Sequence, residues 1–274
     1  MAGLKGGDCY PDDGSVWISK MHPLFYGRKN AEFHAAKQIA LFRNPIDLLA
    51  SYFNMVVLLS HSLEATTDLK DIEEWHTVFI PTMVRRIKEY QINIDNIAKE
   101  IPTFYLTYEQ LILEPEETLI NMFTFLLGVE SLEGTVIEQR IKDSVKEGGA
   151  EKAVYQLKTE EQSKNLCRQL HNYTEEDLSL MKEQLREMLF FWGYAKHPHE
   201  ENPTAFFDFE DTNDEDLSHY NKFKELNKQA MEHRTESFNG TLHTCNRDIF
   251  GAENIEEWKQ ILSLPAKLTI KEKK

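Results

Sequence analysis

The stretch Lys37-Gln-Ile-Ala-Leu-Phe-Arg-Asn-Pro-Ile-Asp-Leu-Leu-Ala-Ser51 decides how this chain folds. It begins with an apolar run of strand-forming residues, Ile39 to Phe42, which ends at Arg43. Asn44 then suits the N-cap of a helix and Pro45 its first position, and an acidic residue follows in the first turn. The stretch therefore predicts a strand, a sharp turn and a helix, with an arginine at the helix N-terminus.

This turn is also a candidate anion site. The free N–H groups and the dipole of a helix N-terminus favour a negative charge, and the guanidinium of Arg43 adds a planar donor that can bind two oxygens. An ordinary strand-to-helix turn with a surface arginine has the same residues. The residues of the turn leave both interpretations open.

Composition limits the classes of partner. The chain has 274 residues, of which 41% are hydrophobic, so it can form one large domain with a substantial core, or a domain with an extension. Its net charge of −15 argues against nonspecific binding to nucleic acid or to an anionic membrane surface. It does not exclude a local basic pocket for one anion.

The cysteines and the apolar runs indicate the compartment. Cys9, Cys167 and Cys245 are widely spaced and form neither a disulfide framework nor a metal-ligand pattern. No run reaches the roughly 18 to 20 apolar residues of a membrane span, and the N-terminus lacks the apolar core of a signal peptide. We therefore expect no metal, no membrane segment and a reducing compartment, the cytoplasm.

Three strands alternate with helices along the chain. The strands are expected over Val16–Lys20, Gln38–Phe42 and Thr103–Thr107. This alternation predicts an α/β domain with a parallel sheet flanked by helices, in which ligands collect at the carboxyl ends of the strands. The polar side chains at or just past these ends are those of Lys20, His22, Arg43 and Tyr108.

The remaining elements follow from apolar periodicity and from capping signals, such as Thr174 with Asp177 three residues later and Gly128 at the end of the helix 116–127. Helices are expected over 45–60, 72–100, 116–127, 135–146, 174–192, 216–233 and 253–262, with a short one from Tyr108. Pro81 either kinks the second helix or lies in the first turn of a new one. Residues 24–36, 61–71 and 150–171 are expected as loops. The chain divides into an irregular arm (1–15), a domain (16–194) and an extension (195–274) whose first part reads as a solvated acidic linker.

Three motifs resemble the sulfotransferases that use 3′-phosphoadenosine 5′-phosphosulfate (PAPS). Lys20-Met-His22-Pro resembles a Lys-Thr-His-x-Pro segment that ends a strand in that family. Arg43 to Ser51 is similar to the family's Arg-Asn-Pro-x-Asp-x-x-x-Ser, and Tyr108-Glu-Gln-Leu resembles a Tyr-Glu-Asp-Leu segment after a strand. The resemblance covers roughly residues 16–194 and implies a P-loop-kinase-like α/β fold.

The resemblance also implies the roles of these residues, with PAPS as co-substrate. His22 would be the general base that deprotonates the acceptor, and Lys20 would assist it. Arg43 and Ser51 would hold the 3′-phosphate of PAPS, and the ring of Tyr108 would lie beside the adenine.

Other features of the family pattern are missing or altered. No Pro-Lys-Ser-Gly-Thr-Thr-like phosphosulfate loop precedes Lys20, so we expect a fold that lacks its first strand and this loop. The chain is then either an N-terminally incomplete piece, which is preferred and would leave room for a preceding Golgi anchor, or a degenerate relative. The family's Arg-Lys-Gly segment is also absent; Arg168 or Lys164 could replace it, and Ser144 is a weaker match to another cofactor contact.

The sequence therefore predicts transfer of a sulfuryl group from PAPS to a hydroxyl or amine of a small-molecule or carbohydrate acceptor, with the activity of this chain alone left open. The alternative is a non-catalytic nucleotide-binding or interaction protein on a degenerate scaffold. A truncated kinase is disfavoured, because no Gly-Lys-Ser/Thr phosphate loop is present. The acceptor is not identified, because loops such as 24–36 and 61–71 would select it.

Overall fold

Two parallel strands form the centre of the domain. The computed structural model describes residues 6–7, 18–19, 31–58, 63–65, 68–146, 167–236, 241–245 and 270–272. Strand β4 (Gln38–Phe42) pairs in parallel with β6 (Thr103–Thr107), with Gln38 opposite Thr103 and Phe42 opposite Thr107. The structure therefore confirms two of the expected strands and their parallel pairing.

The strand that was expected over Val16–Lys20 pairs outside the β4–β6 sheet. Only Ile18–Ser19 (β2) of that segment is described, and it pairs in parallel with Gly6–Gly7 (β1) of the arm that was expected to be irregular. Within the described residues the central sheet therefore has two strands and not three, because the hydrogen bonds of β2 go to β1.

Two further strand pairs each include a segment that was expected to be a loop. Strand β3 (Ala31–Ala35) pairs antiparallel with β7 (Thr241–Cys245), and β5 (Leu63–Ala65) pairs antiparallel with β8 (Ile270–Glu272). All four are short, and each partner lies far away in the sequence, so local patterns did not reveal them. The helix expected over 253–262 lies outside the described residues.

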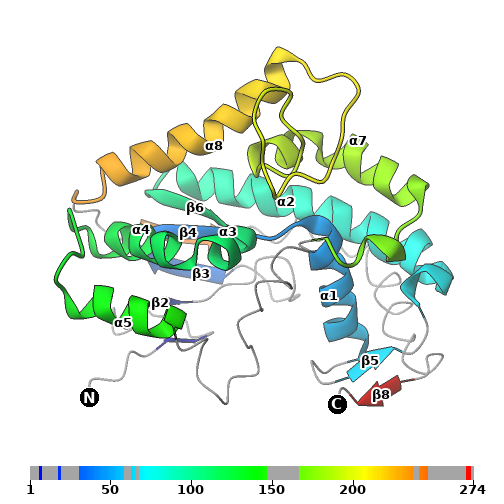
Figure 1. Cartoon of the computed structure of the whole chain (residues 1–274), viewed down its shortest axis with the longest axis horizontal. Helices are drawn as coiled ribbons and strands as arrows, with labels where there is room; N and C mark the ends of the chain where they lie inside the picture. Colours follow the sequence, from blue (N-terminus) through cyan, green and yellow to red (C-terminus); the bar gives the residue numbers. More distant parts are fainter. Residues whose placement is uncertain are drawn as a thin grey trace.

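Helices cover both faces of the β4–β6 sheet (Figure 1). Helices α2 (Ile80–Ala98) and α7 (Glu175–Phe191) pack on the face that carries Ala40, Phe42 and Tyr105. Helix α4 (Pro115–Leu127) packs on the opposite face, against Phe104 and Leu106, and α5 (Val136–Lys146) lies beyond it. Alternate residues of each strand thus face opposite layers, as the two-residue period of a strand requires.

The helix boundaries agree closely with the sequence pattern. Helix α1 (Pro45–Leu58) follows β4, and the short α3 (Tyr108–Leu113) follows β6. Pro81 lies in the first turn of α2, directly after a π-helical turn, Trp75–Phe79, and a 3₁₀ helix precedes both at Leu69–Asp71. In the described part of the chain, no helix is long and apolar enough to cross a membrane.

Local capping signals are also in place. Thr174 caps α7, and its N–H is bound in return by the carboxylate of Asp177, as predicted. Gly128 ends α4 with a φ of 65°, a left-handed conformation that suits glycine. A short 3₁₀ helix, Leu170–Asn172, leads into α7.

The segment after α7 is packed, and this corrects the prediction of a solvated linker. Phe207 is 2% exposed, and Ala195 forms a parallel bridge with it. Helix α8 (Asp214–Glu232) then crosses the free edge of β6, where the Asn227 side chain accepts from the N–H of Tyr105 (2.7 Å) and donates to its carbonyl (2.8 Å). The prediction of a solvated linker followed from the acidic composition of this segment, but a few aromatic residues anchor the segment to the core.

Candidate functional site

The candidate site lies where β4 and β6 end. Phe42 is opposite Thr107, so the next residues of the two strands, Arg43 and Tyr108, come side by side. The guanidinium of Arg43 lies 4.7 Å from the centre of the Tyr108 ring, a cation–π contact. The Arg43 side chain is 22% exposed and therefore accessible from solvent.

The first turns of α1 extend this site. The Asn44 side chain accepts a hydrogen bond from the N–H of Ile46 at 3.0 Å, which makes it the expected N-cap. The buried carboxylate of Asp47 lies 3.4 Å from Nη2 of Arg43. Ser51 follows Asp47 by one helical turn, on the same side of α1, and is exposed.

A third segment, the turn Cys167–Gln169, packs against the start of α1. The N–H of Gln169 donates to Oδ1 of Asp47 at 3.2 Å, and the hydroxyl of Tyr173, four residues later, donates to the carbonyl of Ile46 at 2.6 Å. Arg168 precedes Gln169 and is exposed, so its backbone lies beside the same turn. The structure thus brings Arg43, Ser51, Tyr108 and the Arg168 turn to one end of the sheet.

Cys167, in the same turn, is a partly buried free thiol. Burial raises its pKa to about 12, and the negative charge of Asp47 adds to this shift. A thiol with so high a pKa stays protonated near neutral pH and is a poor nucleophile.

Glu109 is a buried part of the site that the sequence did not reveal. It is 1% exposed; Oε1 accepts from the N–H of Asn44 at 3.1 Å, and Oε2 accepts from the hydroxyl of Tyr194 at 2.6 Å. Burial raises the pKa of this carboxyl, although its two hydrogen bonds and the charge of Arg43 oppose the shift. An acidic residue after a strand end was a visible signal, but its partner Tyr194 is 85 residues away in the sequence.

Arg43 has donor capacity that the described part of the chain does not use. Its buried Nε has no hydrogen-bond partner among the residues that the structure describes. Its contact with Asp47 is long for a charge-assisted hydrogen bond. A guanidinium with a free donor, an aromatic ring beneath it and an exposed serine nearby is suited to bind an anion such as a phosphate.

The other predicted site residues lie elsewhere. Ser144 is exposed on α5, which packs beside α4 and away from α1 (Figure 1). Lys20, His22 and Lys164 lie outside the described residues. Their roles therefore stay predictions.

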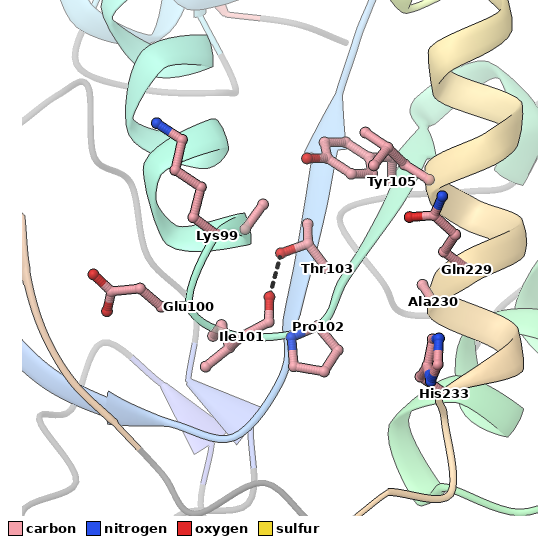
Figure 2. Close-up of a pocket in the computed structure, with 11 residues that line it drawn as sticks. Lys99, Glu100, Ile101, Pro102, Thr103, Tyr105, Gln229, Ala230 and His233 are labelled. Atoms are coloured by element: carbon pink, nitrogen blue, oxygen red, sulfur yellow. Dashed lines mark hydrogen bonds between the residues drawn. The ribbon is translucent and has the colours of Figure 1, made fainter.

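A separate hollow lies at the opposite end of the sheet. A cavity of about 250 Å³ is lined by residues at the end of α2, the start of β6 and the last turns of α8. Figure 2 shows Gln229 and His233 of α8 facing Pro102 and Thr103. This cavity is not the candidate site, because Arg43 and Tyr108 follow the other ends of the two strands.

Comparison with known protein families identifies the class of this domain. The family model described as the sulfotransferase domain matches residues 18–192, which is more than half of the chain. The chain therefore belongs to the sulfotransferase domain family, whose general chemistry is sulfuryl transfer. No curated protein and no solved structure matches the chain.

Proposed function

We propose that this chain transfers a sulfuryl group from PAPS to a hydroxyl or amine of a small-molecule or carbohydrate acceptor. The observation that carries the proposal is the partly exposed side chain of Arg43, which lies on the ring of Tyr108, with Ser51 exposed on the same helix, α1. The wide spacing of the three cysteines supports a reducing compartment, the cytoplasm, as the place of the reaction.

The residues at the strand ends would bind the nucleotide. Arg43 would donate to the 3′-phosphate through the exposed part of its side chain, and the hydroxyl of Ser51 would add a further hydrogen bond. The ring of Tyr108 would lie beside the adenine, and Arg168, whose turn packs against the start of α1, would contribute positive charge. Binding energy obtained far from the reacting sulfur would orient the sulfuryl group for attack.

Two residues of the Lys20-Met-His22 segment would carry out the chemistry. The neutral imidazole of His22 would accept the proton of the acceptor hydroxyl as its oxygen attacks sulfur, because an unperturbed histidine titrates near neutral pH. The ammonium of Lys20 would stabilise the negative charge that develops during transfer.

A binding experiment tests the nucleotide site. Adenosine 3′,5′-bisphosphate should bind the full chain, and Arg43→Ala should weaken binding by about 10- to 100-fold, because a hydrogen bond to a charged group contributes about 1.5 to 3 kcal/mol. Arg140→Ala is the matched control, since Arg140 is an exposed arginine on α5. Equal affinities of the wild type and Arg43→Ala would leave Arg43 as an ordinary turn residue.

A transfer assay tests the chemistry separately. Sulfate transfer from PAPS to a panel of hydroxyl and amine acceptors should be measured for the wild type and for His22→Ala, with a loss of at least about 100-fold expected for a general base. Undiminished turnover in the variant would remove His22 from the mechanism. Nucleotide binding without turnover on any acceptor would favour the alternative, a non-catalytic nucleotide-binding or interaction protein.

A further inference from the structure

Glu109 lies buried between the turns that carry Arg43 and Tyr108. We propose that Glu109 is a positioning residue of the phosphate site and that it takes up a proton when a phosphate anion binds beside Arg43. The inference rests on the proposed nucleotide site and adds a coupling between anion binding and protonation.

The positioning role follows from the hydrogen bond to Asn44. Glu109 lies in the first turn of α3, and its Oε1 accepts a hydrogen bond from the backbone N–H of Asn44 at 3.1 Å. Asn44 is the N-cap of α1 and directly follows Arg43. One carboxyl group therefore fixes the turn after β4 to the turn after β6, and with it the approach of Arg43 to Tyr108.

The surroundings of Glu109 can accommodate a proton. The hydroxyl of Tyr194 lies 2.6 Å from Oε2 of Glu109 and 3.5 Å from the carbonyl of Phe42. When Glu109 is ionised, Tyr194 donates to it. When Glu109 is protonated, its own O–H can donate to the Tyr194 oxygen, and the tyrosine O–H can turn to Phe42. Both protonation states thus keep their buried polar groups paired, so neither has the cost of an unpaired group.

The charges around Glu109 favour protonation when an anion arrives. Five titratable groups of the described residues pack near it, and among these only Arg43 is a cation. The others are Asp47 of the β4–α1 turn, Tyr108 beside Glu109 on α3, Cys167 of the neighbouring turn and Tyr194 after α7. A bound phosphate adds negative charge to a site that already holds two carboxylates, and like charges raise carboxyl pKa values. Burial has already raised the pKa of Glu109, so further repulsion moves it towards neutral pH.

The sign of the coupling follows from linkage. If binding raises the pKa of Glu109, the complex holds more protons than the free protein in the interval between the two pKa values. Affinity then falls as pH rises through this interval, by up to about tenfold per pH unit for one proton.

Calorimetry measures this coupling directly. Binding of adenosine 3′,5′-bisphosphate to the full chain should be measured at one pH in buffers of different ionisation enthalpy, for the wild type and Glu109→Gln. The glutamine imitates the protonated acid, because it accepts from Asn44 and donates to Tyr194. We expect the wild type to take up more protons than the variant, and the variant to bind at least as tightly with a flatter pH profile. Protonation of the nucleotide's own phosphates contributes to both and cancels in the difference.

Two further variants keep the test decisive. Tyr194→Phe removes a donor to the carboxylate, so Glu109 should be protonated before the nucleotide binds and proton uptake should decrease. Glu117→Gln removes an exposed carboxylate on α4 and should leave the uptake at the wild-type value. Equal uptake by the wild type and Glu109→Gln, or an equal decrease in Glu117→Gln, would overturn this inference and leave the nucleotide site intact. No binding by the wild type would overturn both.

Discussion

Two arginines in this molecule have similar neighbours and different surroundings. Arg43 at the end of β4 and Arg186 on α7 each lie 4.7 Å from the centre of an aromatic ring, that of Tyr108 and that of Phe209. Each also has a nearly buried carboxylate within reach. The difference lies in how many donors of each guanidinium find an acceptor.

Arg186 is almost fully paired. Its Nε and Nη2 bind the two oxygens of Asp216 at 2.8 and 2.7 Å, and its remaining donors reach Asp211. Hydrogen bonding from Arg186 holds the pKa of Asp216 below its usual range. This bidentate pair, one partner on α7 and the other on α8, fastens the two helices together.

Within the described part of the chain, the side chain of Arg43 makes one hydrogen bond, a long contact to Asp47, and its Nε has no hydrogen-bond partner. The pKa of the nearby Glu109 is raised by burial, opposite to that of Asp216. The comparison indicates that the Arg186 pair is a completed structural contact, whereas the Arg43 site has donors left for a ligand.

The largest expected effect is a difference in stability between alanine variants of the two arginines. Arg186→Ala leaves the nearly buried carboxylate of Asp216 without its partner and should lower the free energy of unfolding by about 2 to 4 kcal/mol. Arg43→Ala should lower it by less than about 1 kcal/mol, because its contact with Asp47 is weak and Asp47 keeps the N–H of Gln169. Urea denaturation of both variants measures the difference. Similar losses of stability in the two variants would contradict the comparison.

Variants of the two aromatic partners, Tyr108 and Phe209, should also differ: the first should lose nucleotide affinity and the second should lose stability. Tyr108→Leu should weaken binding of adenosine 3′,5′-bisphosphate by about 3- to 10-fold, because Arg43 loses the ring that supports it, and should change stability little. Phe209→Leu should lower stability by about 1 kcal/mol and leave nucleotide affinity unchanged. Calorimetric titration and urea denaturation of both variants supply the two readouts. Loss of affinity in Phe209→Leu would show that the regions are coupled.

The smallest expected effect is in the pH dependence of stability. Asp216 has a lowered pKa, so its contribution is present above its unfolded-state pKa and is lost as pH falls through the folded value. Glu109 has a raised pKa, so its contribution is present below its unfolded-state pKa and is lost as pH rises through the folded value.

Replacing each carboxyl group by its amide should therefore change stability in opposite directions near neutral pH. Asp216→Asn should be less stable than the wild type there by about 1 kcal/mol, with the difference vanishing in acid. Glu109→Gln should be at least as stable as the wild type there, with its advantage also vanishing in acid. Thermal unfolding between about pH 3 and 8 measures both trends. A lower stability of Glu109→Gln near neutral pH would show that the ionised carboxylate stabilises the fold.

Local signals predicted much of this structure. Strands β4 and β6, the Asn44 cap, the Thr174 cap and the glycine at the end of α4 all depend on residues within a few positions of each other. The short strand pairs were missed, because β3 and β5 find their partners near the other end of the chain. The solvated linker was wrong for a similar reason: Phe207 is buried by segments that its local composition does not indicate.

The sequence by itself determined the turn from Arg43 into α1 and the tyrosine after β6, because capping and strand propensity act over short distances. Only the tertiary structure placed the ring of Tyr108 under Arg43, and only it buried Glu109 between Asn44 and Tyr194. The physical reason is that strand register and burial depend on the whole packed core. The anion site can be anticipated from a motif, but the buried acid that we expect to tune it cannot.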